Sequence, residues 1–277
     1  MRSTVKHLGT LCLIVGGTLL VGVSAAQIPP ERQAEGLSVP DFSGFWNHTV
    51  PQIDFENPPG GGPGPVKNTL PIIGNNPVWV GNHANPILKP HAADAVRRFG
   101  ELEKIGQGPP TAQMVCMMSG VPNAYTLMGS IQILQTPEMV MLVHQRDHQV
   151  RRIYMNVAHT ANPKPSWYGE SVGHYEGDAL VVDTIGLNDR TVTDRNGTPH
   201  SDAMHVVERI RLIEEGRRLE VQFTVTDPET FNMPWSAMVR YQRNRQTIIE
   251  EEICAENNFD VITKKMFPIP IAEKPDF

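Results

Sequence analysis

The stretch PHSDAMHVVERIRL, at positions 199–212, contains the residue types that acid–base chemistry needs. In a strand that begins at Met204, side chains alternate between two faces. A carboxylate removed from water holds its proton more tightly, which suits a general acid or base near neutral pH. Glu208 would be the single charge on an apolar face. That face carries Val206, Glu208, Ile210 and Leu212, and the opposite face carries His205, Val207, Arg209 and Arg211.

Two roles for Glu208 follow from this placement. In the first, Glu208 transfers a proton, and either His174 or His205 is its partner. Arg209 or another cation would then balance negative charge that develops on the substrate. In the second, Glu208 pairs with an arginine or a histidine, and its role is structural. The sequence leaves both roles open.

His174 belongs to SVGHYEGDALVVDT, at positions 171–184. We interpret this stretch as a hairpin with the turn Gly177–Asp178, because a two-residue loop that begins with glycine suits the twist of paired strands. A strand histidine among valines is either a hydrogen-bonded core residue or part of a cavity wall. The predicted register pairs Tyr175 with Leu180, His174 with Val181, and Gly173 with Val182.

Six further side chains are candidates for binding a small substrate. His144 ends the run MVMLVH on the face of Val140 and Leu142. Two polar candidates precede the strand at 204–213 in a turn, from which they could reach a pocket mouth or simply be solvated. The aromatic candidates could line a cavity, although aromatic residues also fill barrel cores. The set is His144, Trp167, Tyr168, His200, Asp202 and Trp235.

No cofactor is predicted. Metal sites leave short spacings, such as two histidines three or four positions apart on a helix. His144 and His148 are four apart, but in a strand or turn, where four residues span about 13 Å. A bound divalent ion is therefore only an alternative. The chain also lacks an esterase G-x-S-x-G motif and a phosphate loop, and one helix cannot supply the βαβ units of a nicotinamide site.

Residues 1–26 are predicted to be a signal peptide. A basic start is followed by the apolar run LCLIVGGTLLVGV at 11–23 and by the small residues SAAQ. This run is shorter than the ~20 residues of a membrane-spanning helix. A retained N-terminal anchor is the alternative.

The charge balance of the exported chain limits its partners. Loss of Arg2 and Lys6 would change the formal charge from −6 to −6 − 2, about −8. An acidic chain without a basic cluster is unsuited to binding nucleic acid or anionic lipid. We therefore expect a periplasmic or secreted protein, not inserted in a membrane after signal removal, whose partner is a small organic ligand or substrate.

Cys116 and Cys254 are the cysteines that remain after export. Two thiols in an oxidising compartment favour a disulfide. A nucleophilic thiol is the alternative, but neither MVCMMSG nor EEICAEN contains a histidine that could act as its base.

The elements that position these residues follow from hydrophobic periodicity. Residues 27–110 are predicted to form an irregular Pro- and Gly-rich arm with a strand start at 41–46 and one helix at 89–108, and residues 111–277 an antiparallel β domain in one structural unit with the arm. The chain is therefore mainly β, with a meander that closes into a calycin-like barrel or folds into a two-sheet sandwich. The predicted strands are 131–136, 139–144, 150–156, 167–176, 179–186, 204–213, 218–227, 234–243 and 247–254.

Several of these motifs together resemble an uncharacterised family of exported bacterial proteins. The likeness covers roughly residues 112–258 and includes GHYEGDALVVDT, which is similar to the family motif G-x-W-E-G-D-T-L-V-V-D-T, and HVVERIRL, which is similar to its H-V-x-E-R-F motif. Tyr175 stands where the family usually has tryptophan, and CMMSGVP is a looser form of its Cys-Gly-Pro segment. The resemblance implies an exported β-rich protein and supplies no catalytic residues. DFSGFW is also similar to the G-x-W of lipocalin first strands.

Two functions of different classes fit these observations. The first is an exported acid–base enzyme, a hydrolase, lyase or isomerase, that acts on a small molecule inside a barrel cavity. The second is a lipocalin-like carrier that binds an apolar ligand without catalysis. A histidine–carboxylate pair within about 3.2 Å at the bottom of a cavity would favour the enzyme. An aliphatic interior without such a pair would favour the carrier, and a fully packed interior would favour a protein that acts through its surface.

Overall fold

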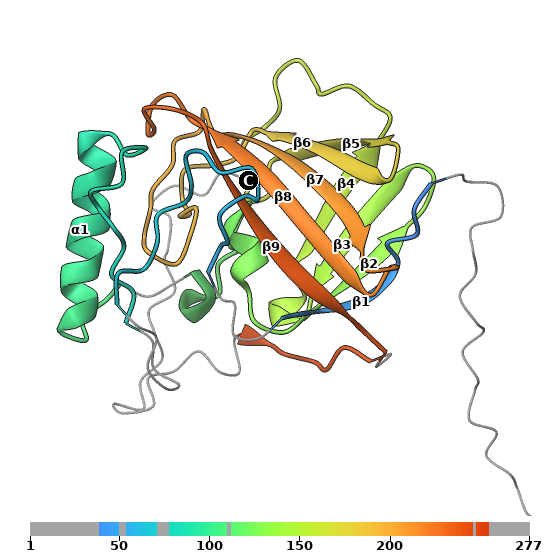
Figure 1. The fold of residues 1–277 in the computed structure, drawn as a ribbon, viewed down its shortest axis with the longest axis horizontal. Helices are drawn as coiled ribbons and strands as arrows, with labels where there is room; N and C mark the ends of the chain where they lie inside the picture. The colour runs from blue at the N-terminus through green and yellow to red at the C-terminus, as the bar shows by residue number, and fades with distance from the viewer. Residues whose placement is uncertain (1–38, 50–53, 71–77, 110–111, 246–247, 255–277) are drawn as a thin grey trace, which may run out of the picture. The chain divides into compact units, whose positions relative to one another are not determined.

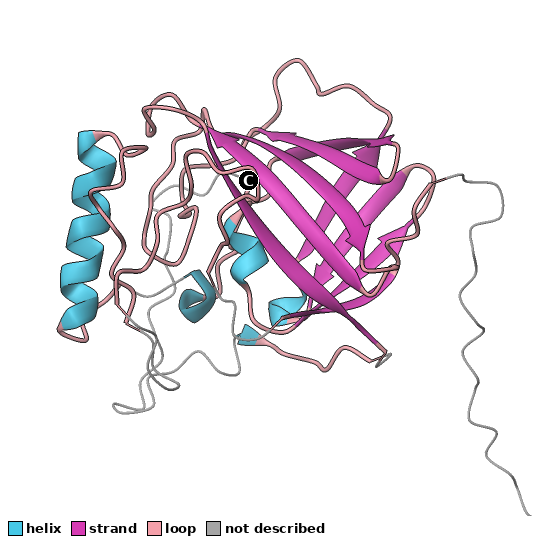
Figure 2. Ribbon diagram, in the orientation of Figure 1, coloured by secondary structure: helices cyan, strands magenta, loops and turns pink. Residues whose placement is uncertain are grey.

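A computed structural model describes residues 39–49, 54–70, 78–109, 112–245 and 248–254. Nine strands form a closed barrel in which each strand pairs with its neighbours in chain order and β9 pairs with β1 (Figures 1 and 2). The strands are β1 Gly44–His48, β2 Ser130–Gln135, β3 Met139–His144, β4 Val150–Met155, β5 Glu170–Glu176, β6 Ala179–Ile185, β7 His205–Ile213, β8 Arg218–Thr226 and β9 Trp235–Asn244. The predicted mainly β fold and its barrel form are confirmed. The predicted signal peptide lies outside the described residues.

The helices are few and short. The single α-helix of the described residues is α1, Pro90–Lys104, which lies beside the barrel in Figure 1. It begins with proline, as predicted, but ends four residues before the predicted helix at 89–108 does. Short 3-10 turns cover η1 Ala112–Val115, η2 Asn123–Thr126 and η3 Arg146–His148.

The barrel is not entirely antiparallel, which corrects the prediction of an antiparallel meander. β4 and β5 pair in parallel, with Ile153 opposite Ser171 and Met155 opposite Gly173. Parallel neighbours need a crossover connection of a dozen or more residues. The long connection at 156–169 supplies that crossover between the ends of β4 and β5.

The predicted hairpin at 171–184 is confirmed in its register. Tyr175 lies opposite Leu180 and His174 lies opposite Val181. Gly177 adopts a φ of 61°, a backbone conformation that glycine reaches without the steric cost of a side chain. The turn therefore sets the register that the sequence indicated.

The predicted strand at 247–254 is wrong. Its described part, residues 248–254, pairs with no strand of the barrel. The strand start expected at 41–46 supplies β1, which pairs with β9 through positions such as Trp46 and Arg243. Because β1 and β9 close the sheet, no free edge remains for a tenth strand.

Apolar side chains fill most of the barrel interior. They alternate along the strands with outward residues, as in β3, where Val140, Leu142 and His144 are buried. Large aromatic residues, including Trp46 and Trp235, are fully buried among them. The interior is therefore a packed core with a polar part, and that part contains the candidate site. No helix in the described portion of the chain is both long enough and apolar enough to cross a membrane.

Candidate functional site

Glu208 points into the barrel and is completely buried. Arg151, on β4, donates from Nη1 to Glu208 Oε1 at 2.8 Å and from Nη2 to Oε2. The hydroxyl of Tyr125, on η2, also donates to Oε1. Both carboxylate oxygens are therefore occupied by donors, and the contacts correspond to the structural alternative for Glu208.

Two hydroxyl groups complete this set of contacts. Arg151 Nη2 donates to Thr184 Oγ1 at 2.9 Å and to Ser171 Oγ at 3.1 Å. We call these five residues, Tyr125, Arg151, Ser171, Thr184 and Glu208, the interior network. Burial opposes the charge of Arg151, but Glu208 outweighs it and raises the pKa of the guanidinium. Burial, and then the charge of Glu208, raises the pKa of the Tyr125 hydroxyl. The network is thus a fixed ion pair bridged by a protonated phenol.

η2 carries Tyr125 to the interior network from outside the sheet. Tyr241 on β9 donates from its hydroxyl to the backbone oxygen of Tyr125 at 3.1 Å. The ring of Tyr125 also stacks on Phe223 with centroids 6.4 Å apart. These contacts hold the η2 turn against the barrel strands.

His144, at the end of β3, is 1% exposed, and neither of its ring nitrogens has a hydrogen-bond partner among the described residues. Burial lowers its pKa to about 3, with contributions from the charges of Arg151 and His48. The imidazole is therefore neutral at physiological pH and offers one N–H and one lone pair. The predicted placement of His144 on the face of Val140 and Leu142 is confirmed, and that face is buried.

A second histidine lies near the same end of the barrel. The ring of His48, the last residue of β1, is 4.4 Å from the ring of Tyr241 between centroids. Burial lowers the pKa of His48 to about 4; the Leu127 backbone opposes this shift and the charge of Arg195 adds to it. Although Leu127 lies close, neither ring nitrogen of His48 makes a hydrogen bond of normal geometry with a described residue. We call the interior network, His144 and His48 together the polar end of the barrel.

The predicted partners of Glu208 lie on the opposite side of the barrel wall. His205 is partly exposed, and its Nε2 lies 2.8 Å from Asp183 Oδ1. His174 is exposed and contacts Glu176 at 3.0 Å, which corrects the expectation of a core or cavity position. Arg209 is exposed and donates to Glu176 at 2.6 Å. Odd-numbered positions of β7 face outward because side chains alternate, so His205 and Arg209 cannot reach Glu208. His174, on β5, is also on the outer surface and contacts Glu176 instead.

The outer wall also carries a chain of histidine–carboxylate contacts. His159 contacts Glu170 through Nδ1 and Asp183 through Nε2, each at 2.9 Å, and Asp183 in turn contacts His205. In the described part of the chain, no group of three or more His, Cys, Asp or Glu residues is arranged to hold a metal ion.

Three of the predicted substrate-binding residues lie away from the polar end. His200 is buried, and both its nitrogens have partners, Thr191 Oγ1 and the Ser201 carbonyl, each at 2.9 Å. Asp202 is exposed in a turn. Trp235 is buried in edge contact with Phe231, which makes it a core residue.

The other two predicted aromatic residues lie in the crossover connection at 156–169. Trp167 is partly exposed, with the guanidinium of Arg190 5.9 Å from its ring centroid. Tyr168 donates to Gln149 Oε1 at 2.6 Å, and burial raises the pKa of its hydroxyl while the charge of Arg151 opposes that rise. Tyr168 therefore lies within electrostatic reach of the interior network, and Trp167 does not contribute to it.

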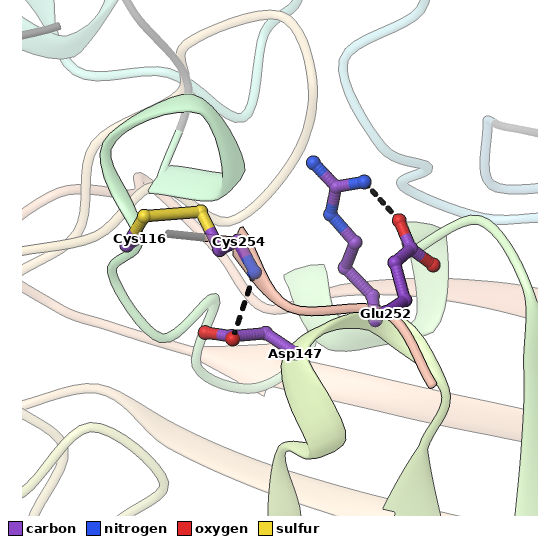
Figure 3. The surroundings of a disulfide bond; sticks show 5 residues. Cys116, Asp147, Glu252 and Cys254 are labelled. Carbon is purple, nitrogen blue, oxygen red and sulfur yellow. Dashed lines mark hydrogen bonds and ion pairs between the residues drawn. A yellow bond between two sulfur atoms is a disulfide. The ribbon is translucent and has the colours of Figure 1, made fainter. Parts of the chain in front are cut away.

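The predicted disulfide between Cys116 and Cys254 is confirmed (Figure 3). It is flanked by a hydrogen bond from the Cys254 backbone N–H to Asp147 Oδ1 at 3.2 Å. Glu252 pairs with Arg146 of η3. These contacts attach the segment 248–254 to the turns beside the polar end. The pair is consistent with an oxidising compartment.

A hollow of about 290 Å³ lies on the outside of the barrel. Its wall includes Pro58, Pro59 and Gly60 of the arm, and its floor consists of residues of β7, β8 and β9, among them Arg209 and Thr224. The hollow is therefore separate from the buried polar end.

Sequence reasoning missed Arg151 and His48, and it did not predict that Tyr125 contacts Glu208. Arg151 and His48 were readable, because each lies two positions from a buried apolar residue on the same face of its strand, Ile153 and Trp46 respectively. Tyr125 lies in a short turn, where periodicity gives no signal. Comparison with known proteins adds no functional residue, since no family model matches the sequence and no curated protein is similar to it.

Proposed function

We propose that this protein is an exported enzyme that performs acid–base chemistry on a small organic molecule at the polar end of the barrel. In this proposal His144 exchanges the proton with the substrate. One observation carries it: His144 is buried, and both its ring nitrogens are unpaired among the described residues. Because more than about 90% of buried polar groups have partners, an imidazole without any suggests a position that a ligand occupies.

The chemistry follows from the state of the imidazole. A neutral ring can accept a proton at one nitrogen and donate a hydrogen bond from the other. With a pKa of about 3, His144 is a weak base in the ligand-free protein. Negative charge on a bound substrate would offset the nearby charge of Arg151 and raise that pKa toward neutrality. The substrate would thus help to make His144 an effective base.

The interior network has a positioning role in this proposal. Glu208 binds Arg151 through both its oxygens, so it fixes a guanidinium and the Tyr125 hydroxyl next to the site. Glu208 is therefore replaced by His144 as the proposed proton-transfer group. Hydrolysis, elimination and isomerisation all remain compatible with such a site and need no organic cofactor.

The export part of the proposal rests on the disulfide. Cys116 and Cys254 form a bridge of the kind that persists in oxidising compartments. Together with the apolar N-terminal stretch of the sequence, this supports a periplasmic or secreted protein.

A carrier is the second candidate, and one observation favours it. Every histidine–carboxylate contact found among the described residues lies on the outer wall, and the interior away from the polar end is apolar. A carrier would bind the same molecule and release it unchanged.

Turnover separates the two candidates. We would incubate the protein in D₂O with a panel of small organic acids, esters and hydroxy compounds and follow conversion or C–H exchange by proton NMR. Wild-type protein should convert at least one compound, and His144→Gln should lose most of that activity. His205→Gln, which alters a histidine on the outer wall, is the matched control and should retain it.

Two outcomes would contradict the enzyme. Binding without conversion across the panel would identify a carrier. Equal turnover by His144→Gln and wild-type protein would remove His144 from the chemistry.

A further inference from the structure

Arg195 is partly buried, and it lacks the carboxylate partner that several other buried or partly buried arginines among the described residues have. Arg151 pairs with Glu208, Arg146 with Glu252, and Arg240 with Glu220. Arg195 forms no ion pair with any residue that the structure describes, and its Nε is buried without a hydrogen-bond partner. A buried guanidinium N–H without an acceptor is costly, because its lost hydration is not replaced by a hydrogen bond.

The surroundings of Arg195 fix its position without a carboxylate hydrogen-bonded to the guanidinium. Nη2 donates to the backbone oxygen of Thr126, and the guanidinium lies 5.7 Å from the ring centroid of Trp79. Asp54 is close enough to act on Arg195 electrostatically, but its Oδ1 accepts the Phe55 backbone N–H at 2.9 Å. Burial lowers the pKa of Arg195 to about 10; Asp54 opposes the shift and the charge of Arg146 adds to it. No described carboxylate is hydrogen-bonded to Arg195, although Asp54 attracts it electrostatically.

Arg195 is joined to the polar end through η2. It binds the carbonyl of Thr126, and Tyr241 binds the preceding carbonyl, that of Tyr125. The ring of His48 lies against Tyr241. Through these contacts, Arg195 and His48 approach the same turn that delivers Tyr125 to Glu208.

We infer that Arg195 binds the carboxylate group of a small organic ligand whose remainder reaches the polar end of the barrel. This inference rests on the proposed function and specifies its substrate class. The guanidinium has an unsatisfied Nε donor and no hydrogen-bonded carboxylate, and its planar fork matches a carboxylate in geometry. The anion would also offset the charge that lowers the pKa of His48.

Benzoate and benzamide are suitable probes because they have similar shapes and differ in charge. Binding is measured by saturation-transfer NMR and titration calorimetry at low ionic strength. Wild-type protein should bind benzoate at millimolar concentration or below and bind benzamide at least about tenfold more weakly. Arg195→Gln should weaken benzoate binding by at least about tenfold, and Arg195→Lys should weaken it less. Arg98→Gln, on the exposed side of α1, is the control and should bind as wild type does.

Several results would overturn the inference. One is that wild-type protein does not bind benzoate at millimolar concentration, and another is that it binds benzamide as tightly as benzoate. A third is that both Arg195 variants bind benzoate as tightly as wild type does. Tighter binding of inorganic phosphate or sulfate than of benzoate would also overturn it. Circular dichroism and thermal unfolding identify a variant that has not folded, in which case the comparison of Arg195→Lys with wild type decides.

The His144→Gln variant separates this inference from the proposed function. It should keep Arg195-dependent benzoate binding while it loses turnover. If wild-type protein binds benzoate through Arg195 but converts no compound, the proposed enzyme is wrong and the carboxylate site stands.

Discussion

Arg151 and Glu208 lie 57 positions apart in the chain and meet inside the barrel through two parallel hydrogen bonds, one of them 2.8 Å between Nη1 and Oε1. Their side chains are 1% and 0% exposed. Each charge offsets the desolvation cost of the other, because an isolated charge in this position would lose its hydration without a compensating interaction.

We therefore predict that Glu208→Gln destabilises the fold by about 3–5 kcal/mol, since it leaves Arg151 as an uncompensated buried cation. Chemical denaturation followed by fluorescence measures the loss. Glu176→Gln, which removes an exposed carboxylate from the outer wall, is the control and should leave the midpoint nearly unchanged.

A double variant tests the physical reason for this prediction. Arg151→Met combined with Glu208→Leu should be more stable than Glu208→Gln alone, because no unpaired charge remains. If the double variant is less stable than Arg151→Met alone and Glu208→Gln alone, the ion pair stabilises the fold by more than the compensation of one buried charge by the other.

The disulfide should contribute substantially to stability. Cys116 and Cys254 are 138 positions apart, and a loop of this length corresponds to up to about 5 kcal/mol in the chain-entropy description. Replacement of both cysteines by alanine should lower the unfolding midpoint and make it independent of reductant. The midpoint of the wild-type protein should fall toward that of the variant when reductant is added. An unfolding midpoint that reductant does not change in wild type would contradict this.

His144 should make the fold less stable in acid. Its pKa is lowered from 6.5 to about 3, so below pH 6.5 the unfolded chain binds a proton that the folded protein does not. Above pH 6.5, the neutral His144 contributes roughly 5 kcal/mol to the free energy of unfolding. This contribution is lost as the pH falls toward about 3. Comparison of the pH dependence of unfolding in wild type and His144→Gln measures it. Parallel curves for the two proteins would show that His144 titrates normally.

Asp194 should act in the opposite direction. Burial raises its pKa from 3.8 to about 6, although hydrogen bonds from Thr198 and Asn196 oppose the shift. The folded protein then holds a proton that the unfolded chain releases, so stability decreases as the pH rises from about 4 to about 6, by about 3 kcal/mol. Asp194→Asn should remove this decrease in the same denaturation series. A variant whose stability still decreases as much across that pH range would contradict the prediction.

Local patterns in the sequence were sufficient to predict most of the barrel. Alternation along 204–213 correctly separated Glu208 from His205 and Arg209, and the glycine at position 177 set the hairpin register. The same alternation already argued against a pairing of Glu208 with His205, because the two positions face opposite sides of one strand. The segment 247–254 was misjudged because its strand propensity says nothing about whether the sheet still has a free edge.

The candidate site required the tertiary structure. Glu208 could have paired with any cation on the inner wall, and the closure of the barrel brought Arg151 to it from another strand. Tyr125 reaches the pair from a turn without periodicity. The surroundings of Arg195 decide that its Nε has no hydrogen-bond acceptor among the described residues.

The sequence by itself determined the β character of the chain, the face on which each strand residue lies and the pair of cysteines that can join, because these depend on local alternation and residue chemistry. The tertiary structure decided which charges meet, which histidines have no hydrogen-bond partner among the described residues and which arginine has no carboxylate bonded to it there. These depend on contacts between residues far apart in the chain, and only the folded barrel creates them.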